Sequence, residues 1–153
     1  MSEDKSTVEL KIIGRVSNKV KEKPAADYKW GELISEIIID PCLTEALEGL
    51  EGFSHIMVFC LMHKVGSEKR AALKVHPRGR RDLPLVGLLA TRSPHRPNPL
   101  GKATVRLLGI EGNILKVKGL DALDGTPVID IKPYIPGYDS ASDASVPTWV
   151  NKL

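Results

Sequence analysis

Short apolar stretches dominate the chain, and their spacing predicts strands more often than helices. We expect strands over 8–16, 32–40, 53–64, 85–91, 103–110, 113–120 and 126–135. The run FSHIMVFCLMHK (53–64) is apolar on both faces, which is typical of a covered central strand. LTEALEGLEG (43–52) has helical spacing instead and predicts one short helix. The pattern therefore predicts a mainly β fold, either a barrel or a strongly curved sheet.

The organisation of the chain is expected to be simple. We predict one β-barrel domain over 1–140, followed by a polar tail over 141–153. No internal repeat and no GxGxxG turn occurs, so a doubly wound nucleotide-binding fold is not expected. No apolar run approaches the roughly 20 residues of a membrane span, and the N-terminus lacks an apolar signal region, so we expect a cytoplasmic protein.

Charge is distributed unevenly along the chain. The net charge is +3, but Lys69 to Arg106 holds ten Lys/Arg and one acid, Asp82. A basic block in an otherwise acidic chain favours a polyanion such as RNA as partner, although an arginine-rich solvated face is the simpler alternative. Cys42 and Cys60 form no CxxC pair and are expected to be free, buried thiols. No spacing of ligand residues is typical of a metal site, so no metal is expected.

ATRSPHRPNPLG (90–101) combines three prolines with hydrogen-bonding side chains. Each proline fixes its own φ and restricts the residue before it, so this loop has little freedom left to lose on binding. Arg92 and Arg96 can each donate two hydrogen bonds to a carboxylate or phosphate group. The loop is either a preorganised binding element or a rigid surface turn.

A second candidate is LDALDGTPVIDIKPY (120–134), in which Asp121, Asp124 and Asp130 lie close together in sequence. Asp-Gly predicts a turn between two strands, and most such turns have no further role. Acids at such a corner can also pair with a bound cation or accept a proton. His63 lies at the end of its predicted strand, where binding residues are often found.

Three segments together resemble the TsaA-like (TrmO) family. They are GLLATRSPHRPNPLG (87–101), LDALDGTPVIDIKPYIP (120–136) and GLEGFSHIMVFCLMHK (49–64), and the resemblance runs from about residue 31 to 139. It implies an S-adenosylmethionine-dependent tRNA methyltransferase built on a β-barrel, usually a homodimer. The expected acceptor is the exocyclic amine of threonylcarbamoyl-adenosine, next to the tRNA anticodon.

The resemblance also implies roles for particular residues. The implied cofactor contacts are His63, Lys64, Arg92, Gly101, Lys102, Asp121, Ala122, Leu123 and Asp124. The basic block and the proline-rich loop supply the expected RNA contacts, which are Arg78, Arg80, Arg81, Arg96 and Asn98. The general base stays open among Asp121, Asp124 and His95.

One segment departs from the family. Bacterial members have a PRQPG-like loop after the first strand, whereas this chain has VKEKPAADYKWG (20–31), which keeps Pro24 without the Arg-Gln pair. Lys102 also stands where relatives often have a small or apolar residue. Two alternatives therefore stay open: a methyltransferase of a small metabolite that uses the same cofactor, and a non-enzymatic RNA-binding β-barrel.

Overall fold

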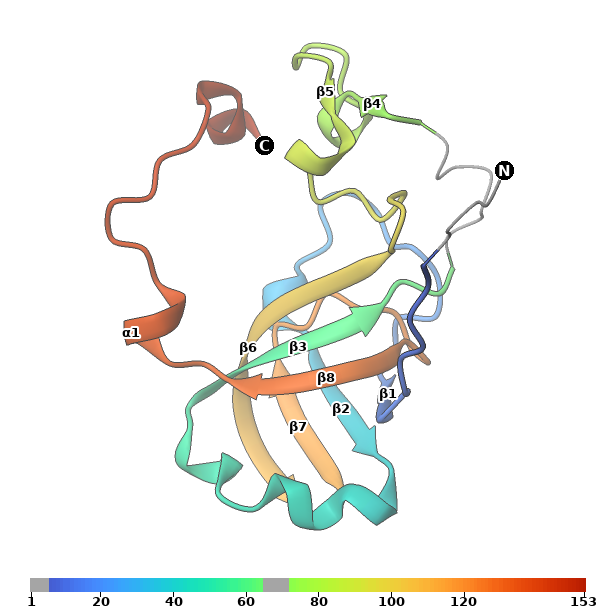
Figure 1. Cartoon of the computed structure of the whole chain (residues 1–153), viewed down its shortest axis with the longest axis vertical. Helices are drawn as coiled ribbons and strands as arrows, with labels where there is room; N and C mark the ends of the chain where they lie inside the picture. Colours follow the sequence, from blue (N-terminus) through green and yellow to red (C-terminus); the bar gives the residue numbers. More distant parts are fainter. Residues whose placement is uncertain (1–5, 65–71) are drawn as a thin grey trace.

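Six antiparallel strands close into a barrel in the order β1-β2-β7-β6-β3-β8, as Figure 1 shows for this computed structural model. The structure describes residues 6–64 and 72–153. The barrel strands are β1 (Gly14–Ser17), β2 (Ile34–Ile39), β3 (His55–Leu61), β6 (Leu100–Glu111), β7 (Ile114–Lys118) and β8 (Pro127–Pro133). The mainly β barrel predicted from the sequence is confirmed.

The remaining elements are short. β4 (Lys74–Val75) and β5 (Val86–Gly87) form a separate two-stranded sheet, and α1 (Pro136–Asp139) is one turn long. The 3₁₀ helices are η1 (Trp30–Glu32), η2 (Pro41–Leu47), η3 (Leu50–Gly52), η5 (Pro77–Gly79), η6 (Leu88–Ala90) and η7 (Thr148–Lys152). None of the helices in residues 6–64 and 72–153 has the length and apolar character needed to cross a bilayer.

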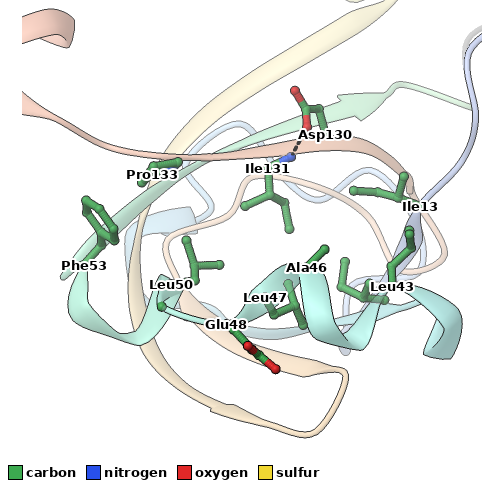
Figure 2. A pocket seen from close by; sticks show the side chains of 12 residues that line it. Ile13, Leu43, Ala46, Leu47, Glu48, Leu50, Phe53, Asp130, Ile131 and Pro133 are labelled. Carbon is green, nitrogen blue, oxygen red and sulfur yellow. Dashed lines mark hydrogen bonds between the residues drawn. The ribbon is translucent and has the colours of Figure 1, made fainter.

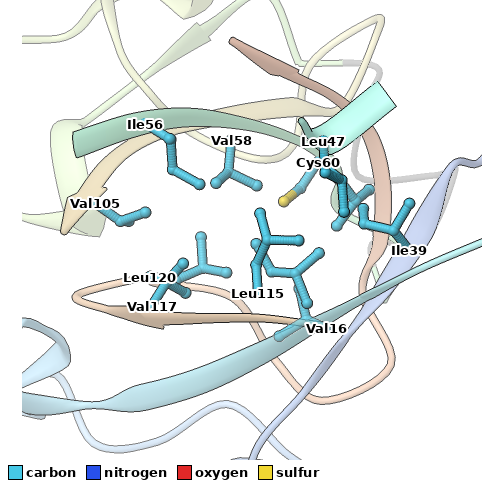
Figure 3. Close-up of a cluster of buried hydrophobic side chains, with 12 residues drawn as sticks. Val16, Ile39, Leu47, Ile56, Val58, Cys60, Val105, Leu115, Val117 and Leu120 are labelled. Atoms are coloured by element: carbon cyan, nitrogen blue, oxygen red, sulfur yellow. The ribbon is translucent and has the colours of Figure 1, made fainter. Parts of the chain in front are cut away.

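Side chains that alternate along each strand fill the barrel. In β2, Ser35, Ile37 and Ile39 are buried, while the residues between them are exposed. Side chains from all six strands and from η2 meet in one apolar cluster (Figure 3). Burying a side chain of this size contributes about 1.5 to 3 kcal/mol, so this cluster supplies the main driving force for closure.

The antiparallel order places the connections alternately at two ends of the barrel. The β1–β2 (18–33), β3–β6 (described over 62–64 and 72–99) and β7–β8 (119–126) connections lie at one end, which we call the charged end. The β2–β3 connection (40–54) and the β6–β7 turn (112–113) lie at the other, which we call the apolar end. Most residues with candidate chemistry therefore fall at the charged end.

Two sequence predictions of regular elements were wrong in extent or type. The first strand, predicted over 8–16, begins at Gly14, because residues 6–12 pair with no neighbouring strand and leave Val8 83% exposed. The helix predicted over 43–52 is two 3₁₀ helices, η2 and η3. Gly49 separates them with φ of 88°, a left-handed conformation that glycine adopts without steric cost.

Two further expectations were also wrong. The covered strand predicted over 85–91 is the two-residue β5 followed by η6, and it buries Leu88 while Leu85 and Leu89 stay exposed. Both cysteines are free, but Cys42 is exposed and Cys60 is buried in the barrel. The division of the chain at residue 140 stays a prediction.

Candidate functional site

Backbone hydrogen bonds fasten the acidic turn to the start of the β1–β2 connection. The Asp124 amide donates to the Val20 carbonyl, and the Gly125 amide donates to the Val16 carbonyl, each at 2.7 Å. Gly125 has φ of 80°, so the Asp-Gly pair predicted as a turn needs its glycine here. These bonds place the carboxylate of Asp124 directly against residues 18–22.

Asn18 ties the same two segments together through its side chain. Its Nδ2 atom donates to the Ala122 carbonyl oxygen at 2.8 Å and to Ser35 Oγ at 3.0 Å. Ser35 is buried on the inner face of β2, so this hydrogen bond satisfies a polar group that would otherwise be costly inside the barrel. Ala122, one of the implied cofactor contacts, is therefore held by its backbone.

Both oxygens of the Asp124 carboxylate have partners. Oδ1 accepts a hydrogen bond from the backbone amide of Asn18 at 2.9 Å, and Oδ2 lies 2.7 Å from Lys21 Nζ. The hydrogen bond from Lys21, followed by that from Asn18, lowers the pKa of Asp124 below its ordinary value. Asp124 is therefore a carboxylate held in its ionised form by the fold.

Lys64 and His63 extend this arrangement from the end of β3. Lys64 Nζ donates to the Lys21 carbonyl and lies 3.5 Å from Glu22 Oε1. His63 Nε2 lies 4.0 Å from the position that a Cβ on Gly125 would take. Desolvation, then the positive charges of Lys64 and Arg15, lower the pKa of His63, which favours the neutral imidazole.

Asp121 is in a different electrostatic state from Asp124. Solvent reaches its side chain, yet the surrounding protein desolvates the carboxyl group and raises its pKa, while the charge of Arg92 opposes this shift. Below it, burial and then the charge of Asp121 raise the pKa of the Cys60 thiol to about 12. In the part of the chain that the structure describes, no side chain lies within hydrogen-bonding or ion-pair distance of the Asp121 carboxylate. Its charge is therefore available to a ligand.

The proline-rich loop is stabilised by hydrogen bonds within itself. Arg96 Nη1 donates to the carbonyls of Thr91 at 2.8 Å and Ser93 at 3.2 Å. The Nδ1 atom of His95 is buried and has no hydrogen-bond partner among the described residues. Arg96, an expected RNA contact, therefore orders the loop that presents Arg92.

Packing at the start of β6 explains why position 101, one of the implied cofactor contacts, is a glycine. Gly101 pairs with Cys60, and a Cβ at Gly101 would meet the Met62 methyl carbon at 2.7 Å. Its neighbour Lys102 pairs with Phe59 and is exposed. The turn residue Leu123 is half-buried, and its carbonyl accepts a hydrogen bond from Thr126 Oγ1 at 2.6 Å.

The other expected RNA contacts differ in whether their side chains contact the rest of the described chain. Arg78 Nη1 donates to the Leu153 carbonyl at 3.4 Å. Arg80 lies 2.6 Å from the Asp82 carboxylate and also donates to the Lys152 carbonyl. Arg81 and Asn98 are exposed, and the side chain of neither makes a hydrogen bond or ion pair within residues 6–64 and 72–153. The part of the basic block at 69–71 lies outside the described residues.

Asp130 does not join the other two acids. It lies on β8, 3.5 Å from Lys132 Nζ, and lines an open groove of about 470 Å³ together with residues of η2 and η3 (Figure 2). This groove lies at the apolar end and contains none of the implied cofactor contacts. Asp130 and Asp124 are therefore close in sequence but do not form a cluster in space.

Three residues of this end were missed by sequence reasoning: Asn18, Lys21 and Glu22. They belong to a polar stretch without periodicity, which predicts a loop and no particular contact. The one available signal was that this stretch stands where the family has its PRQPG-like loop.

Comparisons with known proteins agree on one family. A family model described as the tRNA-methyltransferase O N-terminal domain matches residues 16–140. An S-adenosyl-L-methionine-binding protein of Archaeoglobus fulgidus is 42% identical over 132 residues, which are 85% of this chain and 91% of that protein. The mouse tRNA (adenine(37)-N6)-methyltransferase is 44% identical over 108 residues, 71% of this chain but 25% of that protein.

A solved structure supports the same relationship. The crystal structure of TrmO from Pseudomonas aeruginosa superimposes with a TM-score of 0.73 and 34% identity. The match covers 92% of this chain and 62% of the Pseudomonas chain. The chain thus spans less than two thirds of that protein, whereas it spans nearly all of the archaeal relative.

Proposed function

The chain belongs to the TrmO family, and on that premise we propose that it is an S-adenosyl-L-methionine-dependent methyltransferase acting on tRNA. The observation that carries the proposal is the convergence of three connections at the charged end, where His63, Lys64 and the acidic turn meet around residues 18–22. The positive charge of Arg92 also acts on the Asp121 carboxyl group of that turn.

The chemistry of this end fits the cofactor. S-adenosylmethionine has a sulfonium cation, an amino-acid zwitterion and an adenosine, but no phosphate, so it needs no glycine-rich phosphate loop. The Arg92 guanidinium suits the carboxylate of the zwitterion through two hydrogen bonds. The Asp121 carboxylate suits the amino group or the sulfonium charge.

When bound, the cofactor supplies an electrophilic methyl group. The chain's own task is to orient the acceptor amine and to take its proton, and good orientation alone contributes about 7 to 11 kcal/mol in favourable cases. Asp124 is a poor base because its pKa is low and both oxygens have partners. Asp121, with its raised pKa, is a better candidate, whereas His95 could act only through its other ring nitrogen, because its Nδ1 is buried.

The finer part of the proposal is the acceptor, the exocyclic amine of threonylcarbamoyl-adenosine beside the anticodon. The similarity to the mouse tRNA (adenine(37)-N6)-methyltransferase and the basic block support a tRNA acceptor. Arg78, Arg80, Arg81, Arg96 and Asn98 stay the candidates to contact it, and Arg78, Arg80 and Arg96 also donate hydrogen bonds to backbone oxygens within the fold. The homodimer and the cytoplasmic location stay predictions.

Titration calorimetry with S-adenosylmethionine tests the cofactor half of the proposal. We expect binding by the wild type and a loss of roughly tenfold or more in affinity for Arg92→Ala, because hydrogen bonds to charged groups contribute about 1.5 to 3 kcal/mol. Arg106→Ala, an exposed arginine of the same basic block on β6, is the matched control and should bind normally. No binding by the wild type would refute the proposal.

Mass spectrometry of tRNA nucleosides tests the acceptor. Cells that lack this protein should lack the methyl group on threonylcarbamoyl-adenosine and regain it with the wild-type gene. A normal nucleoside profile, together with intact cofactor binding, would instead favour the small-metabolite alternative. Tight tRNA binding without cofactor binding would favour the non-enzymatic barrel.

A further inference from the structure

Residues 18–22 cross the charged end without a strand or helix of their own. Val20 is the one buried residue among the five and is 7% exposed, while Lys21 and Glu22 are exposed. A segment with one apolar anchor has little burial energy to fix its position. Its placement therefore depends on the polar contacts that it makes with neighbouring connections.

Besides the hydrogen bonds of Asn18 and of the Val20 carbonyl, four charged residues provide these contacts, and we call them the latch: Lys21, Glu22, Lys64 and Asp124. Lys21 Nζ lies 2.7 Å from Asp124 Oδ2, and Lys64 Nζ lies 3.5 Å from Glu22 Oε1. Lys64 also donates to the Lys21 carbonyl. The latch thus joins all three connections of the charged end through residues of opposite charge.

Two members of the latch, Lys64 and Asp124, are implied cofactor contacts, and the other two stand where the family has its PRQPG-like loop. We propose that Lys21 and Glu22 are positioning residues that hold segment 18–22 against the 121–124 turn, so that its backbone lines the S-adenosylmethionine site before the cofactor arrives. This inference rests on the proposed function. Order that exists before binding does not have to be created by the ligand, so it increases affinity.

The size of the effect follows from exposure. The Lys21 side chain is 67% exposed and that of Asp124 is 26% exposed, so solvent partly screens their ion pair. Pairs of this kind correspond to about twofold to fivefold in an equilibrium constant. Because salt weakens exposed ion pairs, the contribution of the latch to cofactor affinity should shrink as ionic strength rises.

The experiment is a titration of wild type and Lys21→Met with S-adenosylmethionine at low and high salt. Lys21→Met should bind about twofold to fivefold more weakly, release the cofactor faster and depend less steeply on salt. Lys21→Arg, which keeps the ion pair, should bind as the wild type does. Lys132→Met removes the comparable pair with Asp130 on β8 and is the matched control, with no expected change.

Two further measurements separate a latch from a direct cofactor contact by Lys21. In the Asp124→Asn background, Lys21→Met should have no additional effect, because its partner is already neutral. In the cofactor-free protein, the Asp124 amide, which donates to Val20, should exchange hydrogen faster in Lys21→Met than in Lys132→Met.

The outcomes also separate this inference from the proposed function. If the wild type binds the cofactor and Lys21→Met binds equally well, the latch is refuted and the proposed function stands. Tighter binding by Lys21→Met would show that the ion pair obstructs the site, which also refutes the inference. If the wild type binds no cofactor, both proposals fall.

Discussion

At the apolar end of the barrel, the β2–β3 connection folds into η2 and η3 and turns Leu43, Leu47 and Leu50 toward the core. At the charged end, three connections meet through hydrogen bonds and ion pairs, and Val20 and Leu33 are the buried apolar residues of the 18–33 connection. The β7–β8 connection at this end also buries Leu120 in the core. The two ends thus differ in what is added to apolar burial: ion pairs and hydrogen bonds between connections are found at the charged end.

The difference separates stability from binding. Apolar burial is non-directional and adds up with area, so the apolar end contributes to the free energy of folding. Each exposed ion pair at the charged end contributes little by itself but fixes a direction. An end held by many weak, directional contacts can present charged groups to a ligand, and it can adjust to the ligand without unfolding the barrel.

The largest expected effect comes from a change at the apolar end. Leu47 is 9% exposed and belongs to the core cluster, although it also borders the open groove. We expect Leu47→Ala to lower the free energy of unfolding by about 2 to 3 kcal/mol, the lower part of the range for such truncations. Urea denaturation measures the loss, and cofactor affinity at low temperature should stay at the wild-type value.

Leu108→Ala is the control for this truncation, because Leu108 is 43% exposed on β6. It should change stability by less than about 0.5 kcal/mol. A clear loss of cofactor affinity in folded Leu47→Ala would show that the two ends are energetically coupled and would contradict the separation argued here.

Two glycines, one at each end of the barrel, test the difference between the ends with a smaller expected effect on stability. Gly49 at the apolar end has φ of 88° and Gly125 at the charged end has φ of 80°. Alanine at either position is strained, so each variant should lose about 1 to 2 kcal/mol of stability. Gly125→Ala alone should also weaken cofactor binding, because the strain falls in the turn that carries Asp121 and Asp124 beside His63, whereas Gly49 lies at the opposite end of the barrel.

Unfolding curves and cofactor titrations on the two variants decide this point. Equal losses of affinity would mean that destabilisation alone reduces binding. Normal affinity in Gly125→Ala would place His63 and the acidic turn outside the cofactor site.

The barrel itself could be predicted because the apolar pattern that indicates each strand lies within that strand's own short segment. The apolar stretch 32–40 predicted the strand β2, and the structure adds which of its residues face inward, since each barrel strand has its own inner and outer face. The helix predicted over 43–52 failed because apolar spacing does not distinguish an α-helix from two 3₁₀ turns on either side of a left-handed glycine. The strand predicted over 85–91 failed because no barrel strand lies beside it.

The site could be predicted in part. The resemblance named Lys64 and Asp124, and the structure brings both to residues 18–22. The resemblance did not indicate that Lys21 contacts both of them. Lys21 and Asp124 are 103 positions apart and joined by a single side-chain contact, which leaves no periodic pattern in either segment. The opposite states of Asp121 and Asp124 were equally hidden, because they depend on the three-dimensional surroundings of two similar residues in one turn.

The smallest expected effect is a difference in acid sensitivity between these two carboxylates. The pKa of Asp124 is lowered by Lys21 and Asn18, so its ionised form stabilises the fold above the ordinary value of 3.8, and this contribution is lost as pH falls below it. The pKa of Asp121 is raised by desolvation, so its ionised form opposes folding, and stability recovers as pH falls through the raised value.

Urea unfolding of Asp124→Asn and Asp121→Asn at about pH 7 and about pH 3 measures how much each ionised carboxylate contributes to the free energy of unfolding. The two contributions are expected to have opposite signs. Asp124→Asn should be less stable than the wild type at neutral pH, and this deficit should shrink in acid because the wild type loses the ionised carboxylate. Asp121→Asn should be at least as stable as the wild type at neutral pH, and any advantage should also shrink in acid. A stability deficit of the same sign in both variants at neutral pH would contradict the division of one turn into a structural carboxylate and a ligand-facing one.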